Sequence, residues 1–248
     1  MKAMKPALLS SSNVRRLMQE GKREGSYAFI RTAQAVDELS RLHDALDSLH
    51  RTPNPSLTKE ARAMKYRAQF TRAMEAGKAS ALAAVDALNA REAEIKKQAE
   101  VRAGLHSHID AATLAEVRNA LRQLPQAERD AAIRDAAQRG DAAVIQAVRN
   151  APSALLTGHV GVPMESLLEM LVTRAAPDLI DELGDISTAF DLLNGATGAF
   201  AREAEARRDP HLEALADDQE ARTRAADALI DAAVAGGPAT LPTDPPAA

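Results

Sequence analysis

Apolar residues recur at alternating steps of three and four along most of the chain, which is the period of a helix with one buried face. The first such stripe runs through residues 27–50 and consists of Ala35, Leu39, Leu42, Leu46 and Leu49. Prolines at 53 and 55 end it, because proline cannot continue the helical hydrogen-bond ladder. The pattern predicts a helix over 27–50 with the seam of a coiled coil or a helical hairpin.

A second stripe follows over residues 58–101 and has small residues at its centre: Phe70, Met74, Gly77, Ala81, Ala84, Leu88 and Ile95. Small seam residues let two backbones approach closely. We therefore expect tight antiparallel packing against the first helix or against a symmetry mate. At about 1.5 Å per residue this helix is about 65 Å long, a length typical of assembly proteins.

Residues 104–235 contain several helix-ending and helix-capping signals, which predict a series of shorter helices. Thr113-Leu-Ala-Glu116 predicts a capping box, and Pro125 fits the first turn of the next helix. Gly140 is expected to end that helix and Asp141 to cap the following one. Further helices are expected from Pro163 to a break at 177, over 178–208, and from the Asp209-Pro210 break to about Val234. The stretch 157–163 is expected to be a connecting loop.

No segment alternates with period two for long enough to form a strand, so the predicted fold class is all-α. We expect a long antiparallel helical hairpin plus a bundle of shorter helices. The predicted organisation is a basic, extended N-terminal arm over 1–25 with a short helix at 14–20, the hairpin over 26–103, the bundle over 104–235, and a Pro-rich tail over 236–248 that is disordered when free.

Composition favours an oligomer. The chain has 248 residues and is 46% hydrophobic, but 54 of those residues are alanine and aromatics are only 2%. Because large side chains supply most of the area that stabilises a core, a monomeric globule of this length would be under-filled. Apolar area buried between subunits would add to the small area that each subunit can bury alone.

Charge is divided unevenly along the sequence. Residues 1–140 hold 24 basic and 17 acidic side chains, whereas residues 141–248 hold 7 and 18. Such asymmetry indicates an end that meets nucleic acid or an acidic surface, or head-to-tail complementarity between subunits. The chain has no cysteine, no apolar run of membrane-spanning length and no secretory signal pattern, so we expect a virion or cytoplasmic location and no membrane partner.

Three groups of titratable residues are candidates for metal binding or for a buried contact. Asp178, Asp181, Glu182 and Asp185 share one helical face, which fits a divalent-ion site but fits better a solvated face or a patch that meets a basic partner. The group His106, His108 and Asp110 is expected to be solvated at a helix end. His43 and His50 are expected to form a partly buried interhelical pair. With no nucleotide-binding or HExxH motif, we expect no catalytic residue, metal or cofactor, and no enzyme.

Basic residues near the amino end are the candidate binding residues. They are candidates for contact with nucleic acid or with an acidic protein partner: Arg15, Arg16, Lys22, Arg23, Lys59, Arg62 and Lys65. Phosphate contact by such residues would be independent of base sequence and sensitive to salt.

The stretches Leu121-Arg-Gln-Leu-Pro-Gln-Ala-Glu-Arg129 and Gly140-Asp-Ala-Ala-Val-Ile-Gln-Ala-Val-Arg-Asn-Ala-Pro152 resemble the Ala- and Arg-rich helical proteins encoded among tailed-phage and prophage virion genes. The resemblance implies a virion component: a connector, a minor or internal head protein, or a cement subunit.

Two hypotheses about function follow from the sequence. One is a non-enzymatic structural protein that acts through helix-mediated homo-oligomerisation and binds other virion or assembly proteins. The other is a sequence-independent nucleic-acid-binding or packaging-associated helical protein.

Overall fold

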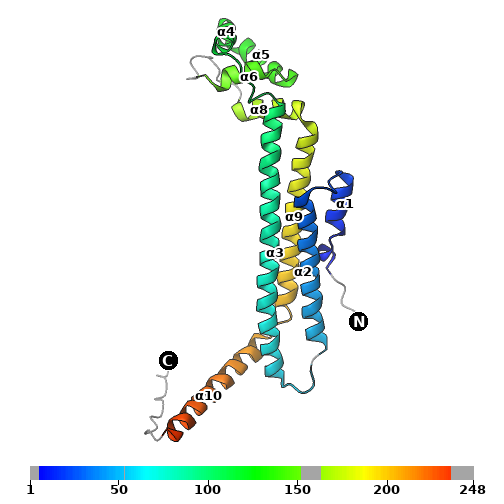
Figure 1. Cartoon of the computed structure of the whole chain (residues 1–248), viewed down its shortest axis with the longest axis vertical. Helices are drawn as coiled ribbons and strands as arrows, with labels where there is room; N and C mark the ends of the chain where they lie inside the picture. The colour runs from blue at the N-terminus through cyan, green and yellow to red at the C-terminus, as the bar shows by residue number, and fades with distance from the viewer. Residues whose placement is uncertain (1–5, 53, 152–162, 236–248) are drawn as a thin grey trace. The chain divides into compact units, whose positions relative to one another are not determined.

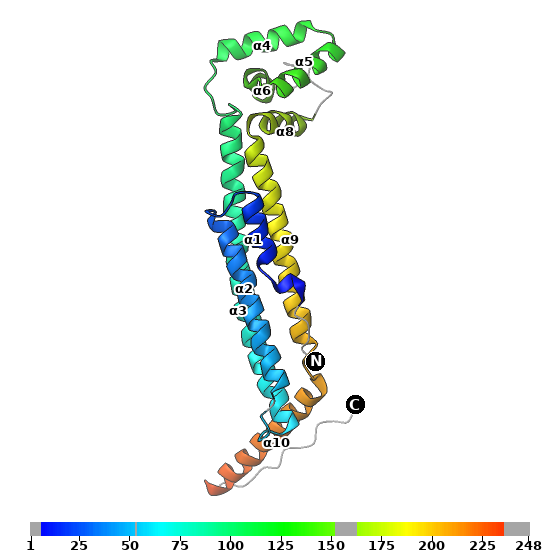
Figure 2. The same ribbon diagram turned by 90° about the vertical axis from the view of Figure 1, so that its right-hand side faces the viewer.

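A computed structural model of the chain describes residues 6–52, 54–151 and 163–235, and all regular elements in these ranges are helical (Figures 1 and 2). The elements are η1 (Ala7–Leu9), α1 (Ser12–Glu20), α2 (Tyr27–Arg51), α3 (Lys59–Arg102), α4 (Ala111–Gln123), α5 (Gln126–Arg139), α6 (Ala142–Arg149), α8 (Met164–Ala175), α9 (Pro177–Glu205) and α10 (Pro210–Val234). The all-α prediction is confirmed. The predicted loop at 157–163, apart from Pro163, and the predicted tail at 236–248 lie outside the described residues.

Helix ends follow the local signals in the sequence. α2 and α3 have almost the predicted bounds, and α8 and α9 are separated at Ala176, next to the predicted break. Gly140 adopts the left-handed conformation (φ 85°) that glycine tolerates best, and ends α5. The Asp141 side chain accepts hydrogen bonds from the backbone N–H groups of Ala143 and Val144, so it caps α6 as expected.

The predicted capping box at Thr113 is wrong. α4 begins two residues earlier, and its cap is Asp110, whose carboxylate accepts the Thr113 backbone N–H at 2.8 Å. The Thr113 hydroxyl donates to the same carboxylate at 2.6 Å and therefore serves the Asp110 cap. These hydrogen bonds, with that of the Thr113 side chain the largest cause, lower the pKa of Asp110.

The chain divides into two compact units. Unit 1 comprises residues 1–9, 37–80 and 196–248, and unit 2 comprises residues 10–36 and 81–195. α2, α3 and α9 each contribute a segment to both units.

In unit 1, α2 and α3 run antiparallel and α9 packs on them. A Cβ atom at Gly77 of α3 would lie 2.9 Å from Leu39 Cδ2 of α2 and 3.3 Å from Phe200 Cε1 of α9. The Tyr66 hydroxyl of α3 donates to the Ala204 carbonyl of α9 at 3.0 Å. The small residue predicted at the seam therefore does allow a close approach, and three helices share it.

Two apolar clusters lie among the described residues of unit 2. The first joins Ala28 and Phe29 of α2 to Ala176, which lies between α8 and α9, and to apolar residues of α3 and α9: Leu88, Ile95, Ala99, Leu179, Ile186 and Ala189. The second is formed mainly by α4, α5, α6 and α8, around Ile133, Ile145 and Leu167, which are fully buried.

The N-terminal segment is helical over much of the range predicted as an extended arm. The short helix expected at 14–20 is present as α1, and its Leu17 and Met18 pack against the first cluster of unit 2. The amphipathic pattern of this segment, with Val14 almost fully buried, explains why it packs instead of remaining extended.

The predicted pair of His43 and His50 is wrong. His43 is buried, and its ring nitrogens lie 3.3 Å from Asp44 Oδ1 and from an Arg207 guanidinium nitrogen. His50 is exposed, and its ring meets the edge of Tyr66 with centroids 6.0 Å apart. The seven-residue spacing places both histidines on one side of α2, but His43 contacts Asp44 and Arg207 whereas His50 contacts Tyr66.

Candidate interaction surfaces

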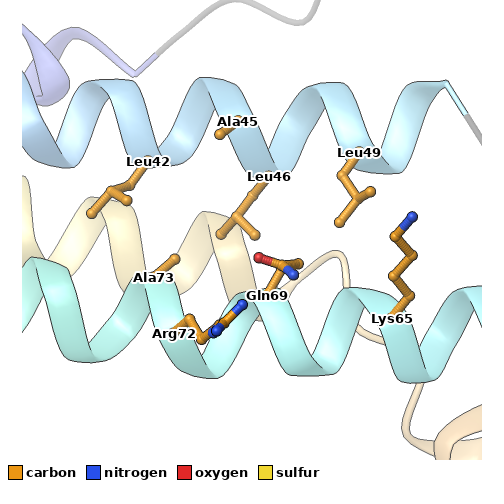
Figure 3. Close-up of a pocket in the computed structure, with 8 residues that line it drawn as sticks. All are labelled: Leu42, Ala45, Leu46, Leu49, Lys65, Gln69, Arg72 and Ala73. Carbon is orange, nitrogen blue, oxygen red and sulfur yellow. The ribbon is translucent and has the colours of Figure 1, made fainter.

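A groove runs between α2 and α3 in unit 1 (Figure 3). It encloses about 350 Å³. Leu42, Leu46 and Leu49 extend from α2 towards α3, and the facing side chains are polar or small. Its lining residues are Leu42, Ala45, Leu46, Leu49, Lys65, Gln69, Arg72 and Ala73.

The groove arises from a mismatch between two helical stripes. The leucine stripe of α2 continues to Leu49, whereas α3 presents Gln69 and Ala73 at the same level. The large stripe residue of α3 at this level is Phe70, whose ring lies 5.0 Å below the guanidinium of Arg208. Leu42 and Leu49 are therefore left only half-buried, beside an edge that carries Lys65 and Arg72.

A second pocket of unit 1 adjoins this groove and shares Leu49 and Lys65 with it. It encloses about 370 Å³, and its lining includes Lys59, Arg62 and Leu212. Three of the predicted binding residues thus lie together at the start of α3. Lys59 and Lys65 are exposed, and the charge of Lys59 acts on neighbouring Glu60. Arg62 donates to the Thr58 carbonyl at 3.3 Å.

The other four predicted binding residues belong to unit 2. Arg15 donates to the Ser11 hydroxyl at 3.2 Å, and exposed Arg16 pairs with Glu20 at 3.8 Å. Lys22 is exposed. Arg23 is mostly buried and forms ion pairs of its own within the unit, so it is not presented to an outside partner in the way the sequence suggested.

Arg23 pairs with the predicted acidic face of α9. Its guanidinium lies 3.5 Å from Glu182 Oε2 and 3.2 Å from Asp185 Oδ2. Glu182 is buried and also accepts two hydrogen bonds from Arg91 of α3, at 2.8 and 3.1 Å. Hydrogen bonding to Glu182 is the largest cause that raises the pKa of Arg91.

The remaining acids of this face differ in environment. Asp178 accepts two hydrogen bonds from Arg102, both at 2.8 Å, and this contact lowers the pKa of Asp178. Asp181 is exposed. A solvated surface fits exposed Asp178 and Asp181 but does not fit buried Glu182. A patch that meets basic side chains does fit, and those side chains belong to this chain.

The other candidate ligand group is solvent-exposed. His106 and His108 are exposed near the end of α3, and His106 Nε2 lies 2.9 Å from Glu100 Oε2. Within the part of the chain that the structure describes, no group of three His, Asp or Glu side chains could hold a metal ion.

α10 is a helix whose distal part is uncovered. Its start is anchored in unit 1: Asp209 caps it, buried Glu213 accepts hydrogen bonds from Arg208, and Asp217 pairs with Arg67 at 2.7 Å. From residue 217 onwards nearly every side chain is exposed, including Ile230 at 60% and Val234 at 83%. The sequence predicted this helix but not its exposure.

The chain matches no known protein family, no curated protein and no solved structure among those compared with it. No helix in the described ranges is both long enough and apolar enough to cross a membrane.

Proposed function

We propose that the chain is a non-enzymatic assembly protein that acts through helix-mediated self-association. The observation that carries this proposal is the distal part of α10, an exposed helix bearing large apolar side chains. Isolated apolar residues on a surface are ordinary, but an uncovered helix has no packing of its own to stabilise it. Contact with another molecule would supply that packing. A virion is the class of assembly that the sequence resemblance favours.

The leading alternative is sequence-independent nucleic-acid binding through the start of α3. Exposed Lys65, Arg72 and Lys78 lack acidic partners among the described residues, which favours contact with phosphates. The surface beside them argues for a protein partner. Lys65 and Arg72 border half-buried leucines, and a phosphate backbone offers nothing apolar to cover these.

Light scattering on a size-exclusion column, run over a hundredfold range of protein concentration, tests the proposal. The expected result is a mass above 26.4 kDa that rises with concentration. Matched variants Val234→Asp and Val101→Asp indicate which surface is involved, because both side chains are exposed valines but only Val234 is on α10. Val234→Asp should lower the mass and Val101→Asp should not. A monomer at every concentration would contradict the proposal.

A further inference from the structure

The groove between α2 and α3 and the distal part of α10 have complementary surfaces. In the groove, half-buried leucines of α2 lie beside Lys65 and Arg72 of α3. On α10, Ala226, Ile230 and Val234 follow at steps of four and share one helical face.

An acidic edge borders that apolar face of α10. Asp227 and Asp231 are one helical turn apart, about 6 Å along the axis, and both are exposed. Neither carboxylate has a basic partner among the described residues. An amphipathic helix with an apolar stripe and an acidic edge is the ligand that an apolar groove with a basic edge accepts.

We propose that the distal part of α10, residues 218–234, docks in the α2–α3 groove of a second copy of this chain. Ile230 and Val234 then cover the half-buried Leu42 and Leu49, while Asp227 and Asp231 face Lys65 and Arg72. This inference rests on the proposed function and names the surfaces through which self-association occurs.

The groove must belong to a second copy because α10 is fixed at its start. Glu213 and Asp217 hold the first two turns against Arg208 and Arg67 of the same unit. Val234 lies about 25 Å along the helix from Asp217. Sharp helix kinks occur mostly at prolines, at Gly/Ser pairs or at π-bulges. Residues 217–234 contain no proline, glycine or serine and lie in one uninterrupted α-helix. α10 therefore cannot fold back onto the groove beside its own base.

Cross-linking between two differently tagged chains tests the contact directly, since the chain has no native cysteine. One chain carries Gln69→Cys in the groove and the other carries Ile230→Cys on α10. A short bis-maleimide should join them into a mixed dimer on a denaturing gel. The control replaces Gln69→Cys by Lys78→Cys, which is exposed on α3 outside the groove. No mixed product, or as much product with Lys78→Cys, would overturn the docking.

Charge exchange provides a second, independent test with exposed residues. Lys65→Glu with Arg72→Glu reverses the groove edge, and Asp227→Lys with Asp231→Lys reverses the α10 edge. Each double variant alone should raise the dissociation constant of self-association at least about tenfold. In a mixed pair that contains one chain of each variant, both grooves meet an α10 of opposite charge, so association should return in the mixture as mixed pairs. Lys78→Glu is the control and should leave the constant unchanged.

The outcomes separate the two proposals. Multimers that persist in both double variants would overturn the docking surfaces and leave self-association standing. A wild-type chain that is monomeric at every concentration would overturn both. Loss in each double variant with recovery in the mixture would support both.

Discussion

Gly77 shows what a single residue contributes to the packing of unit 1. It lies where α3 meets both Leu39 of α2 and Phe200 of α9, and those two side chains are fully buried. A glycine in a helix costs about 1 kcal/mol relative to alanine. That cost is offset here because the absent side chain leaves room for three helices to approach one another.

We predict that Gly77→Leu lowers the free energy of unfolding by about 2 kcal/mol or more, because the added side chain overpacks a filled seam. The matched control is Gly184→Leu in α9, where a Cβ atom would meet nothing within 4 Å. There the same substitution should stabilise by up to about 1 kcal/mol through helix propensity. Urea denaturation followed by circular dichroism measures both. Equal effects at the two sites would show that the close contact at Gly77 does not matter.

Ion pairs between elements have a comparable role in unit 2. Glu182 of α9 is the buried centre of a network that reaches α3 through Arg91 and the segment after α1 through Arg23. A buried carboxylate is tolerated only when its charge is paired and its oxygens are hydrogen-bonded. The network therefore fixes which face of α9 meets α3.

We predict that Glu182→Gln lowers the free energy of unfolding by about 3 kcal/mol, because it leaves two mostly buried guanidinium groups without their shared carboxylate. Glu94→Gln is the control, since exposed Glu94 pairs with the same Arg91 at 2.7 Å. Its loss should cost less than about 1 kcal/mol. Thermal unfolding of the three proteins measures the difference. Similar losses for both variants would mean that burial of Glu182 adds nothing to the pair.

The sequence was informative about elements because their ends depend on local chemistry. Pro53, Gly140 and Asp141 act on their immediate neighbours, so the bounds of α2, α5 and α6 could be predicted. Contacts between side chains of different elements could not be predicted in this way. Glu182 and Asp181 are neighbouring acidic residues, and nothing local indicates that Arg91, 91 residues away from Glu182, covers Glu182 and not Asp181. The groove was missed for the same reason, since it depends on which α3 residues lie opposite Leu46.

At the scale of the whole molecule, part of the charge asymmetry is neutralised within the chain. Basic residues of the first half pair with acids of the second half inside one unit: Arg23 with Asp185, Arg67 with Asp217, Arg91 with Glu182, and Arg102 with Asp178. Other charges of the same two signs have no such partner in the described ranges. They include Lys65 and Arg72 on α3 and Asp227 and Asp231 on α10. A second copy could therefore pair these remaining charges in the same way, with basic residues of the first half of the sequence meeting acidic residues of the second half.

We therefore predict that salt weakens self-association without abolishing it. Raising sodium chloride from 0.1 M to 1 M shortens the screening length from about 10 Å to about 3 Å, and the dissociation constant should rise about tenfold. The apolar contact between α10 and the groove is not screened, so multimers should survive at high protein concentration. Sedimentation velocity at several salt concentrations measures the dissociation constant of self-association.

Fluorescence anisotropy of labelled duplex DNA under the same conditions should show no binding at 0.15 M salt. If DNA bound there, with a logarithmic affinity falling linearly in the logarithm of salt, the basic start of α3 would serve phosphates instead of a second α10.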